Sequence, residues 1–186
     1  MKKRDIVIQV IFILAIVGIA LFEGWTIMHP APVSGYMTVK NFVTSFYTVS
    51  QDDYDYYKES LKGVPSTEIP LTNTAYIAIT DKFKPYFSNQ SFISFTSSRL
   101  SYKRVLTAYK GNVLIKVKSI TIKENFNNAD TQAKTKEYHY EIQLNETNIK
   151  TNKVTVVSHA STLTVVNEKN DNSWKILNSD PNRLEH

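Results

Sequence analysis

The order of apolar and polar residues along the chain divides it into an N-terminal apolar run, a short polar link, a stretch with helical periodicity and a stretch with strand periodicity. Residues 6–22 carry no charge. Apolar residues then recur at spacings of three and four, which predicts an amphipathic helix over about 38–62. From residue 112 onward, apolar and polar residues alternate in twos, the pattern of half-buried β-strands.

The predicted helical part contains further breaks. An acidic cluster interrupts the middle of the first helix, so this segment is one long helix or two shorter ones: Asp52, Asp53 and Asp55. Gly63 and Pro65 end it. A second helix is predicted just before Pro85, which stops it. The Ser-rich stretch that follows has no clear period, and we place a short helix and a first strand near 102–109 in it.

The strand pattern is the clearer of the two. Four segments alternate with period two and are separated by Asn- and Asp-rich turns: 113–124, 135–146, 153–168 and 174–178. Long strands joined by such turns indicate an antiparallel meander. Helices precede strands, so the predicted fold class is α+β rather than α/β. We expect an N-terminal transmembrane helix, then two or three helices packed on a curved antiparallel sheet of about four strands.

The apolar run has the features of a membrane anchor. Its 17 uncharged residues span roughly 26 Å as a helix, and the run extends to about Met28, close to what a bilayer needs. Lys2, Lys3 and Arg4 precede it, so the positive-inside bias keeps the N-terminus in the cytoplasm and places the rest outside. The residues expected to contact lipid are Ile6, Ile11, Phe12, Ile16, Phe22 and Trp25.

Three other interpretations fit this run less well than an anchor. Gly18 and Ala20 have the spacing of a signal-peptidase site, but the apolar run continues past them, which favours the anchor over a cleaved signal peptide. A pilin-type tail is disfavoured because no glycine precedes the run. A lipoprotein is excluded because the chain has no cysteine. The expected organisation is a cytoplasmic N-terminus, an anchor, a stalk, an extracytoplasmic domain and a tag remnant: 1–5, 6–28, 29–37, 38–183 and 184–186.

Composition narrows the chemistry. The absence of cysteine removes disulfides, thiolate nucleophiles and cysteine-ligated metals. The net charge of +5 is spread over scattered cations, which is typical of a solvated sheet face more than of a nucleic-acid surface. Direct nucleic-acid binding is not expected, because no Gly-rich loop or aromatic-basic motif of a nucleic-acid module is present.

The element order resembles the cone-shaped fold of the nuclear-transport-factor-two-like superfamily, over about residues 38–180. That resemblance implies a sheet curled around the first helix. It also implies that an enzyme of this type would use a Tyr/Asp or His/Asp pair inside the cone. The candidates for such a pair are Asp53, Asp55, Tyr54, Tyr56, Tyr57, His139 and His159.

Strand parity separates the two histidines. His139 shares a face with Glu141 and is expected to point to solvent, whereas His159 shares a face with Leu163 and is expected to point inward. Neither histidine has a second ligand at metal-binding spacing, and the acidic cluster is expected to be a solvated helix face. We therefore expect no catalytic residues, no cofactor and no metal. Four tyrosines are candidates for exposed interface residues: Tyr47, Tyr56, Tyr57 and Tyr86.

A single anchor, a short stalk and one extracytoplasmic domain resemble the VirB-eight-like assembly components of type IV secretion systems. The nearest match in layout is the TraH-type and TraM-type transfer proteins of Gram-positive conjugative plasmids. The resemblance implies a non-enzymatic, single-pass cell-membrane protein with an extracellular domain, acting in conjugation (DNA transfer) through contacts with other secretion-channel proteins and with lipid through residues 6–28. A homo-oligomer and a monomer that assembles at the membrane are both compatible with it.

Two other functions stay open at this point. The domain could bind or process a small ligand, which a deep cavity with a buried acid or histidine would favour and a cone filled by side chains would disfavour. A regulatory or stress-linked envelope protein with the same layout is the third reading.

Overall fold

The computed structural model describes residues 34–62, 74–125, 134–167 and 173–178, which all belong to one compact unit, Val33–His186. These described residues form five α-helices, one short 3-10 helix and four strands. The helical elements are α2 (Gly35–Tyr47), α3 (Gln51–Ser60), α4 (Thr74–Asp81), η1 (Lys84–Tyr86), α5 (Asn89–Ser97) and α6 (Leu100–Gly111). The strands are β1 (Val113–Asn125), β2 (Thr135–Asn148), β3 (Val154–Asn167) and β4 (Trp174–Asn178).

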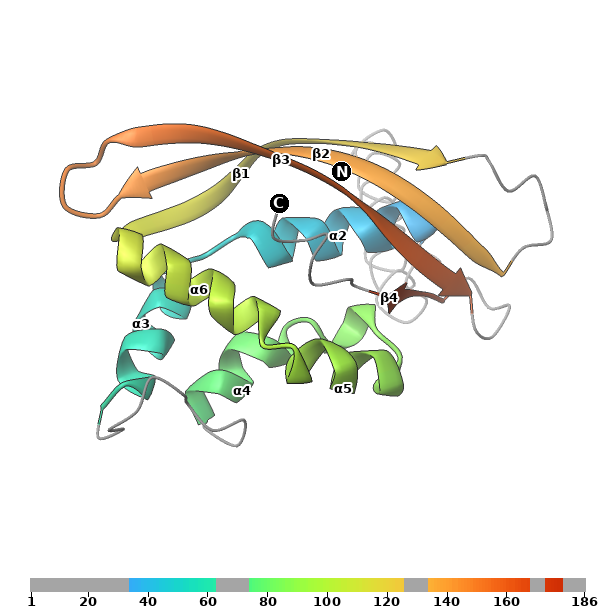
Figure 1. Ribbon diagram of the computed structural model, residues 1–186, viewed down its shortest axis with the longest axis horizontal. Helices are drawn as coiled ribbons and strands as arrows, with labels where there is room; N and C mark the ends of the chain where they lie inside the picture. Colours follow the sequence, from blue (N-terminus) through green and yellow to red (C-terminus); the bar gives the residue numbers. More distant parts are fainter. Residues whose placement is uncertain (1–33, 63–73, 126–133, 168–172, 179–186) are drawn as a thin grey trace, which may run out of the picture. The chain divides into compact units, whose positions relative to one another are not determined.

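The strands form one antiparallel sheet in sequence order, β1-β2-β3-β4. The four predicted strands are confirmed, with boundaries shifted by two residues at most. The register of β1 on β2 shifts between Val117 and Ser119, the mark of a β-bulge. Helices first and a meander afterwards make this an α+β domain (Figure 1).

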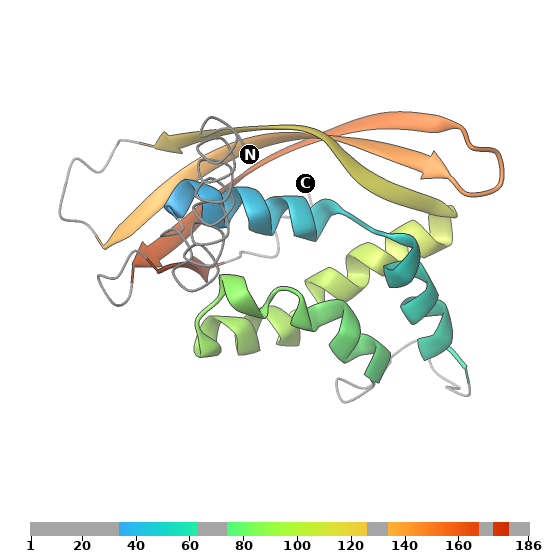
Figure 2. The same cartoon turned by 180° about the vertical axis from the view of Figure 1, so that it is seen from behind.

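Helix α2 is the centre of the domain and lies along the inner face of the sheet (Figures 1 and 2). Its apolar stripe follows the helical period and is buried: Val39, Phe42, Val43, Phe46 and Tyr47. Ser34 caps its N-terminus by accepting a bond from the Met37 amide. Next to this cap, a side chain on Gly35 would meet the Tyr138 ring and Val165 at about 3 Å, so glycine permits close approach to the sheet.

The predicted first helix is two helices, and the break precedes the acidic cluster. Helix α2 ends at Tyr47, and Val49 leaves the helix to exchange two backbone hydrogen bonds with Ile115 of β1, at 2.9 and 3.1 Å. Ser50 and Asp53 then form a capping box that starts α3. The acidic residues are therefore a helix-start signal, since carboxylates are favourable at a helix N-terminus.

A second helical layer covers α2 on the side away from the sheet (Figures 1 and 2). It comprises α4, η1, α5 and α6, so the prediction of two or three helices was too low. The predicted strand near 102–109 is also wrong, because this segment lies inside α6. Leu100, Val105 and Ala108 are its buried residues at helical spacing, and neighbouring aromatic and β-branched residues obscured that period in the sequence.

Among the residues that the structure describes, no helix is long and apolar enough to cross a membrane. The predicted anchor at 6–28 lies outside these residues, as do all six side chains expected to contact lipid. The predicted stalk at 29–37 overlaps the described part only at its end, where Gly35 already begins α2.

Candidate functional site

The two strand histidines lie on opposite faces of the sheet, as predicted. His139 is on the outer face, where its Nε2 lies 3.7 Å from the Glu141 carboxylate and its Nδ1 lies 3.5 Å from the Thr162 hydroxyl. His159 is half-buried on the inner face opposite Ile142, with its ring 5.5 Å from the ring of Tyr47. His139 thus belongs to a surface pair, and His159 belongs to the interior.

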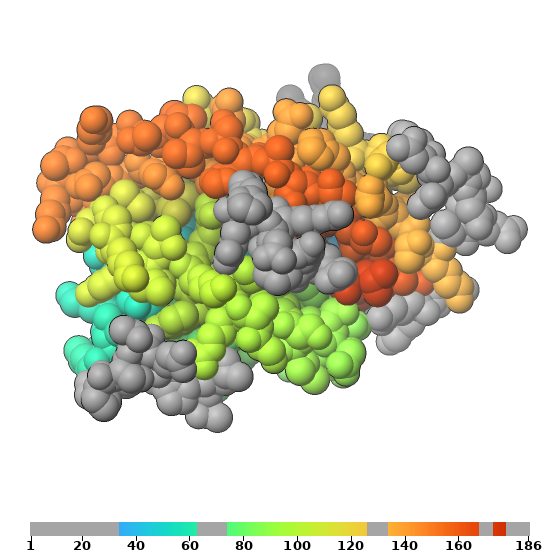
Figure 3. Space-filling view, in the orientation of Figure 1, coloured from blue at the N-terminus to red at the C-terminus, as the bar shows by residue number. Residues whose placement is uncertain are grey.

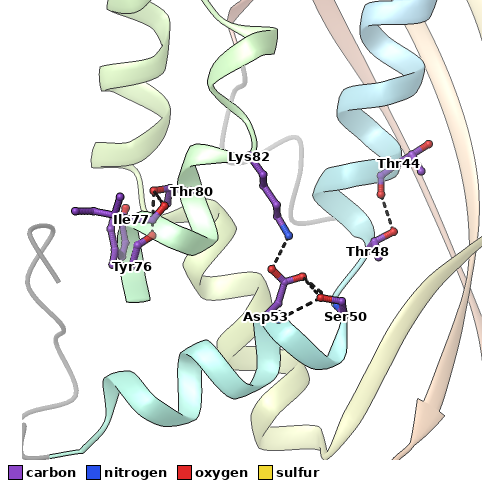
Figure 4. A network of polar contacts seen from close by, with 8 residues as sticks. All are labelled: Thr44, Thr48, Ser50, Asp53, Tyr76, Ile77, Thr80 and Lys82. Carbon is purple, nitrogen blue, oxygen red and sulfur yellow. Dashed lines mark hydrogen bonds and ion pairs between the residues drawn. The ribbon is translucent and has the colours of Figure 1, made fainter. Parts of the chain in front are cut away.

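The acidic cluster is divided between solvent and interior. Asp52 and Asp55 are exposed, and Asp55 accepts a bond from the Gln51 amide. Asp53 is buried, so the expectation of a wholly solvated face is wrong there. It accepts from the Ser50 backbone and hydroxyl and forms a 2.6 Å ion pair with Lys82 (Figure 4). The described residues contain no group of three acids or histidines placed to bind a metal ion.

Of the four tyrosines predicted as interface candidates, some are buried and some are exposed. Tyr47 and Tyr57 are buried, so the expectation that they are exposed is wrong; their ring area is used in the core, because both lie on the inner stripe of their helices. Tyr86 is partly buried and its hydroxyl lies 3.3 Å from that of Ser45. Tyr56 is 47% exposed, and its role at an interface stays a prediction. The Tyr54 ring lies 4.9 Å, centre to centre, from the ring of Tyr109, and the two rings are tilted by 41°.

A cavity of about 500 Å³ lies where the inner face of the sheet meets α6. Its polar walls come from three elements: Arg104 of α6, Glu146 of β2 and His159 of β3. Phe46 of α2 and Ile115 of β1 belong to its apolar walls. We name it the Arg104 cavity. The rest of the inner face is filled by the aromatic core around α2, so the interior is partly filled and partly open.

Arg104 is held in the cavity by an aromatic contact. Its guanidinium carbon lies 4.3 Å from the centre of the Tyr47 ring, a cation–π geometry. The Tyr47 hydroxyl is 3.2 Å from the Tyr140 hydroxyl. Burial lowers the pKa of Arg104, and the nearby Tyr47 and Glu146 oppose that effect. The Nε of Arg104 is buried and has no hydrogen-bond partner among the described residues.

Sequence reasoning treated Arg104 only as one of several scattered cations. A signal was present, since Leu100, Arg104 and Ala108 follow one another at four-residue steps and so share a helix face. A cation in line with two buried apolar positions indicates a buried charge. That signal could be used only after the segment had been assigned to a helix.

Burial of three tyrosines in the interior, Tyr47 on α2 and Tyr138 and Tyr140 on β2, predicts alkaline unfolding. Burial raises the pKa of Tyr47, Tyr138 and Tyr140, while tyrosines in the unfolded chain keep a pKa of about 10. Above that pH the unfolded chain loses protons that the folded chain retains, so stability is complete below about pH 10 and falls above it. Each such tyrosine should contribute a slope of up to about 1.4 kcal/mol per pH unit.

Denaturant unfolding at pH 8 and pH 11, followed by circular dichroism, measures this fall. Tyr140→Phe should make it less steep, because the phenylalanine cannot ionise in either state. An equal free energy of unfolding at both pH values would contradict the interpretation.

The β2–β3 hairpin carries an exposed apolar surface. Ile149 is 37% exposed, Val154 52% and Val156 48%, and we name these three residues the hairpin surface. Val154 and Val156 share the outer face of β3, opposite Thr147 and Asn145 of β2. Figures 1 and 3 show the hairpin at one end of the sheet, beside α6.

The hairpin turn is held firmly. The Asn148 side-chain oxygen accepts from the amides of Lys150 and Thr151, each at 3.0 Å. Asn152 adopts the left-handed conformation that asparagine tolerates. The Ile149 amide donates to the Asn112 carbonyl at 2.9 Å, which ties the turn to the end of α6. The surface is thus presented in one conformation, which lowers the entropic cost of binding.

One edge of the hairpin is open. β4 pairs with β3 only over Thr164–Asn167, so among the described residues no strand pairs with the outer edge of 154–163. An exposed apolar row beside an unpaired edge is where another chain can add a strand.

These features define an α+β domain with helices on a four-stranded antiparallel sheet and a preformed surface of the kind found at protein contacts. No family model matches the sequence, and no curated protein matches it.

Two solved structures have partial similarity to this chain. A periplasmic fragment of TraM has 11% identity and a TM-score of 0.42, over 75% of this chain and 88% of that one. The intermembrane-space region of the chloroplast protein ARC6 has 12% identity and a TM-score of 0.29, over 76% and 91%. At these TM-scores neither likeness defines a family or a function.

Proposed function

We propose that the chain is a non-enzymatic, membrane-anchored scaffold of a conjugative type IV secretion channel, acting through protein–protein contacts. The observation that carries the proposal is the hairpin surface, where Val154 and Val156 are half-exposed beside an open strand edge. Monomeric proteins limit exposed apolar patches and open edges, so their combination favours a partner.

The setting of this contact follows from the chain layout. The basic N-terminus and the apolar run at 6–28 favour a single-pass protein with its N-terminus in the cytoplasm. The domain would then lie on the extracellular face of a Gram-positive cell, where other channel proteins are its partners. An anchor concentrates it with those partners in the plane of the membrane, which raises their effective concentration.

Conjugation assays test the proposal in donor cells that carry a clean deletion of the gene. We expect DNA transfer to fall at least about tenfold and to recover with the wild-type gene. Complementation with the Val154→Glu, Val156→Glu variant should fail, because two charges on the hairpin surface oppose burial against a partner. Unchanged transfer in the deletion strain would contradict the role in conjugation.

A matched control separates the hairpin surface from exposure in general. Ile93 of α5 is 57% exposed, and α5 lies in the helical layer, away from the hairpin (Figure 1). Ile93→Glu should complement the deletion within about twofold, because surface substitutions rarely change stability by more than about 0.5 kcal/mol. An equal loss of DNA transfer with both variants would show that the hairpin surface has no specific role in transfer.

A second candidate function is the binding of a small ligand. The observation that favours it is the Arg104 cavity, which is open while the inner face around α2 is filled. The two functions use different surfaces and are compatible in one protein.

A further inference from the structure

The Arg104 cavity contains a charged donor that lacks an acceptor. The Nε of Arg104 is buried without a hydrogen-bond partner among the described residues, and the face of the guanidinium lies against the Tyr47 ring. A hydrogen-bond donor on a charged group is costly to bury unpaired, because it loses its bonds to water and gains none in return. Arg104 also lines the cavity, so an acceptor that reaches the edge of its guanidinium would satisfy this donor.

The charges around the cavity favour an anion. Arg104 and Lys103 are cationic, and Glu146 is the one carboxylate among the described lining residues. Glu146 acts on Arg104 through space, but no ion pair within 4.0 Å joins the two. Two cations and one carboxylate among the described lining residues favour an anionic ligand, and a carboxylate carries a single negative charge.

Shape and polarity describe the rest of the ligand. Phe46, Leu106 and Ile115 supply apolar wall, and about 500 Å³ is within the range of small-molecule sites. The planar edge of a guanidinium matches the two oxygens of a carboxylate.

We propose that the Arg104 cavity binds a monoanionic carboxylate with an apolar body, the carboxylate on the guanidinium edge of Arg104 and the body against Phe46 and Ile115. This site is separate from the hairpin surface and does not depend on the conjugative role. The carboxylate has two possible sources: a separate small molecule, or the chain's own acid that follows β4 in the sequence, Asp180.

Ligand-observed nuclear magnetic resonance on the full chain in detergent tests the proposal with 4-phenylbutyrate as the probe. Its neutral amide, 4-phenylbutanamide, has the same body without the charge. We expect saturable binding of the acid, at least about tenfold weaker binding of the amide, and weaker binding of inorganic phosphate than of the acid.

Three variants locate the binding. Arg104→Met keeps the apolar stem of the side chain and should weaken the binding of 4-phenylbutyrate at least about tenfold. Arg104→Lys keeps the charge without the planar edge and should also weaken it, so a failure of the methionine variant to fold leaves the test intact. Lys150→Met, on the exposed hairpin turn, is the control and should stay within about twofold of wild type.

The Asp180→Asn variant distinguishes the two sources. Tighter binding of the probe in this variant means that the chain's own carboxylate competes for the cavity, whereas unchanged binding means a separate ligand; either result agrees with a carboxylate site. The proposal is overturned if the acid does not bind, if acid and amide bind equally, if phosphate binds more tightly than the acid, or if both Arg104 variants bind like wild type.

Discussion

Phe42→Ala should lower the free energy of unfolding by about 3–5 kcal/mol. The Phe42 side chain is fully buried on α2 and lies at the centre of the aromatic core. Its ring is within 6.0 Å, centre to centre, of five other rings: Phe46, Phe83, Tyr86, Phe87 and Phe95. Truncation leaves a cavity among side chains of α2, α5, η1 and the residues on either side of η1. A local shift of one element cannot close this cavity.

Denaturant unfolding of the full chain in detergent, followed by circular dichroism, measures this loss. Met37→Ala is the matched control, because Met37 lies on the same helix and is 41% exposed. We expect it to cost about 0.5 kcal/mol or less. A loss below about 1 kcal/mol for Phe42→Ala would mean that the second helical layer does not pack on α2 as described.

Asp53→Ala should lower the free energy of unfolding by about 2–4 kcal/mol. The substitution removes the capping box with Ser50, which typically contributes about 1 kcal/mol. It also leaves Lys82 without its carboxylate at 2.6 Å (Figure 4). Hydrogen bonds to charged groups contribute about 1.5–3 kcal/mol, and the Lys82 side chain, 34% exposed, recovers part of that loss through water.

Asp52→Ala is the control for this second prediction. Asp52 lies in the same first turn of α3 but is exposed, so its loss removes only the weak interaction with the helix dipole, about 0.3–1 kcal/mol. A double-mutant cycle with Lys82→Met separates the ion pair from the cap. Equal costs for Asp52→Ala and Asp53→Ala would contradict the buried role of Asp53.

The strands were the part of the fold that the sequence predicted best. Their side chains alternate with a period of two apart from the bulge in β1, and even β4, with five residues, matches its prediction from Trp174 to Asn178. The α2–α3 break was harder, because it depends on Val49 pairing with Ile115, far along the chain. Helix α6 was missed because its aromatic and β-branched residues favour strands locally, and tertiary packing outweighs that preference.

The candidate sites were less accessible to sequence reasoning. Parity correctly assigned the faces of His139 and His159, since strand direction alone decides them. The Arg104 cavity is lined by residues from α2, α6 and all three long strands. A local sequence pattern cannot predict that these five elements come together. Asp53 likewise has its ion-pair partner, Lys82, in a different segment of the chain, which the local sequence pattern does not indicate. Val154 is exposed at the end of β3 that β4 does not reach, and the length of that pairing cannot be predicted from the local sequence.

Photo-crosslinking in intact donor cells tests the central claim most directly. A photoreactive amino acid at position 156, on the hairpin surface, should form covalent adducts with a protein encoded among the DNA-transfer genes, identified by mass spectrometry. The same group at position 93 on α5 should form few or none. An absence of such adducts at position 156, or equal yields at both positions, would contradict the account.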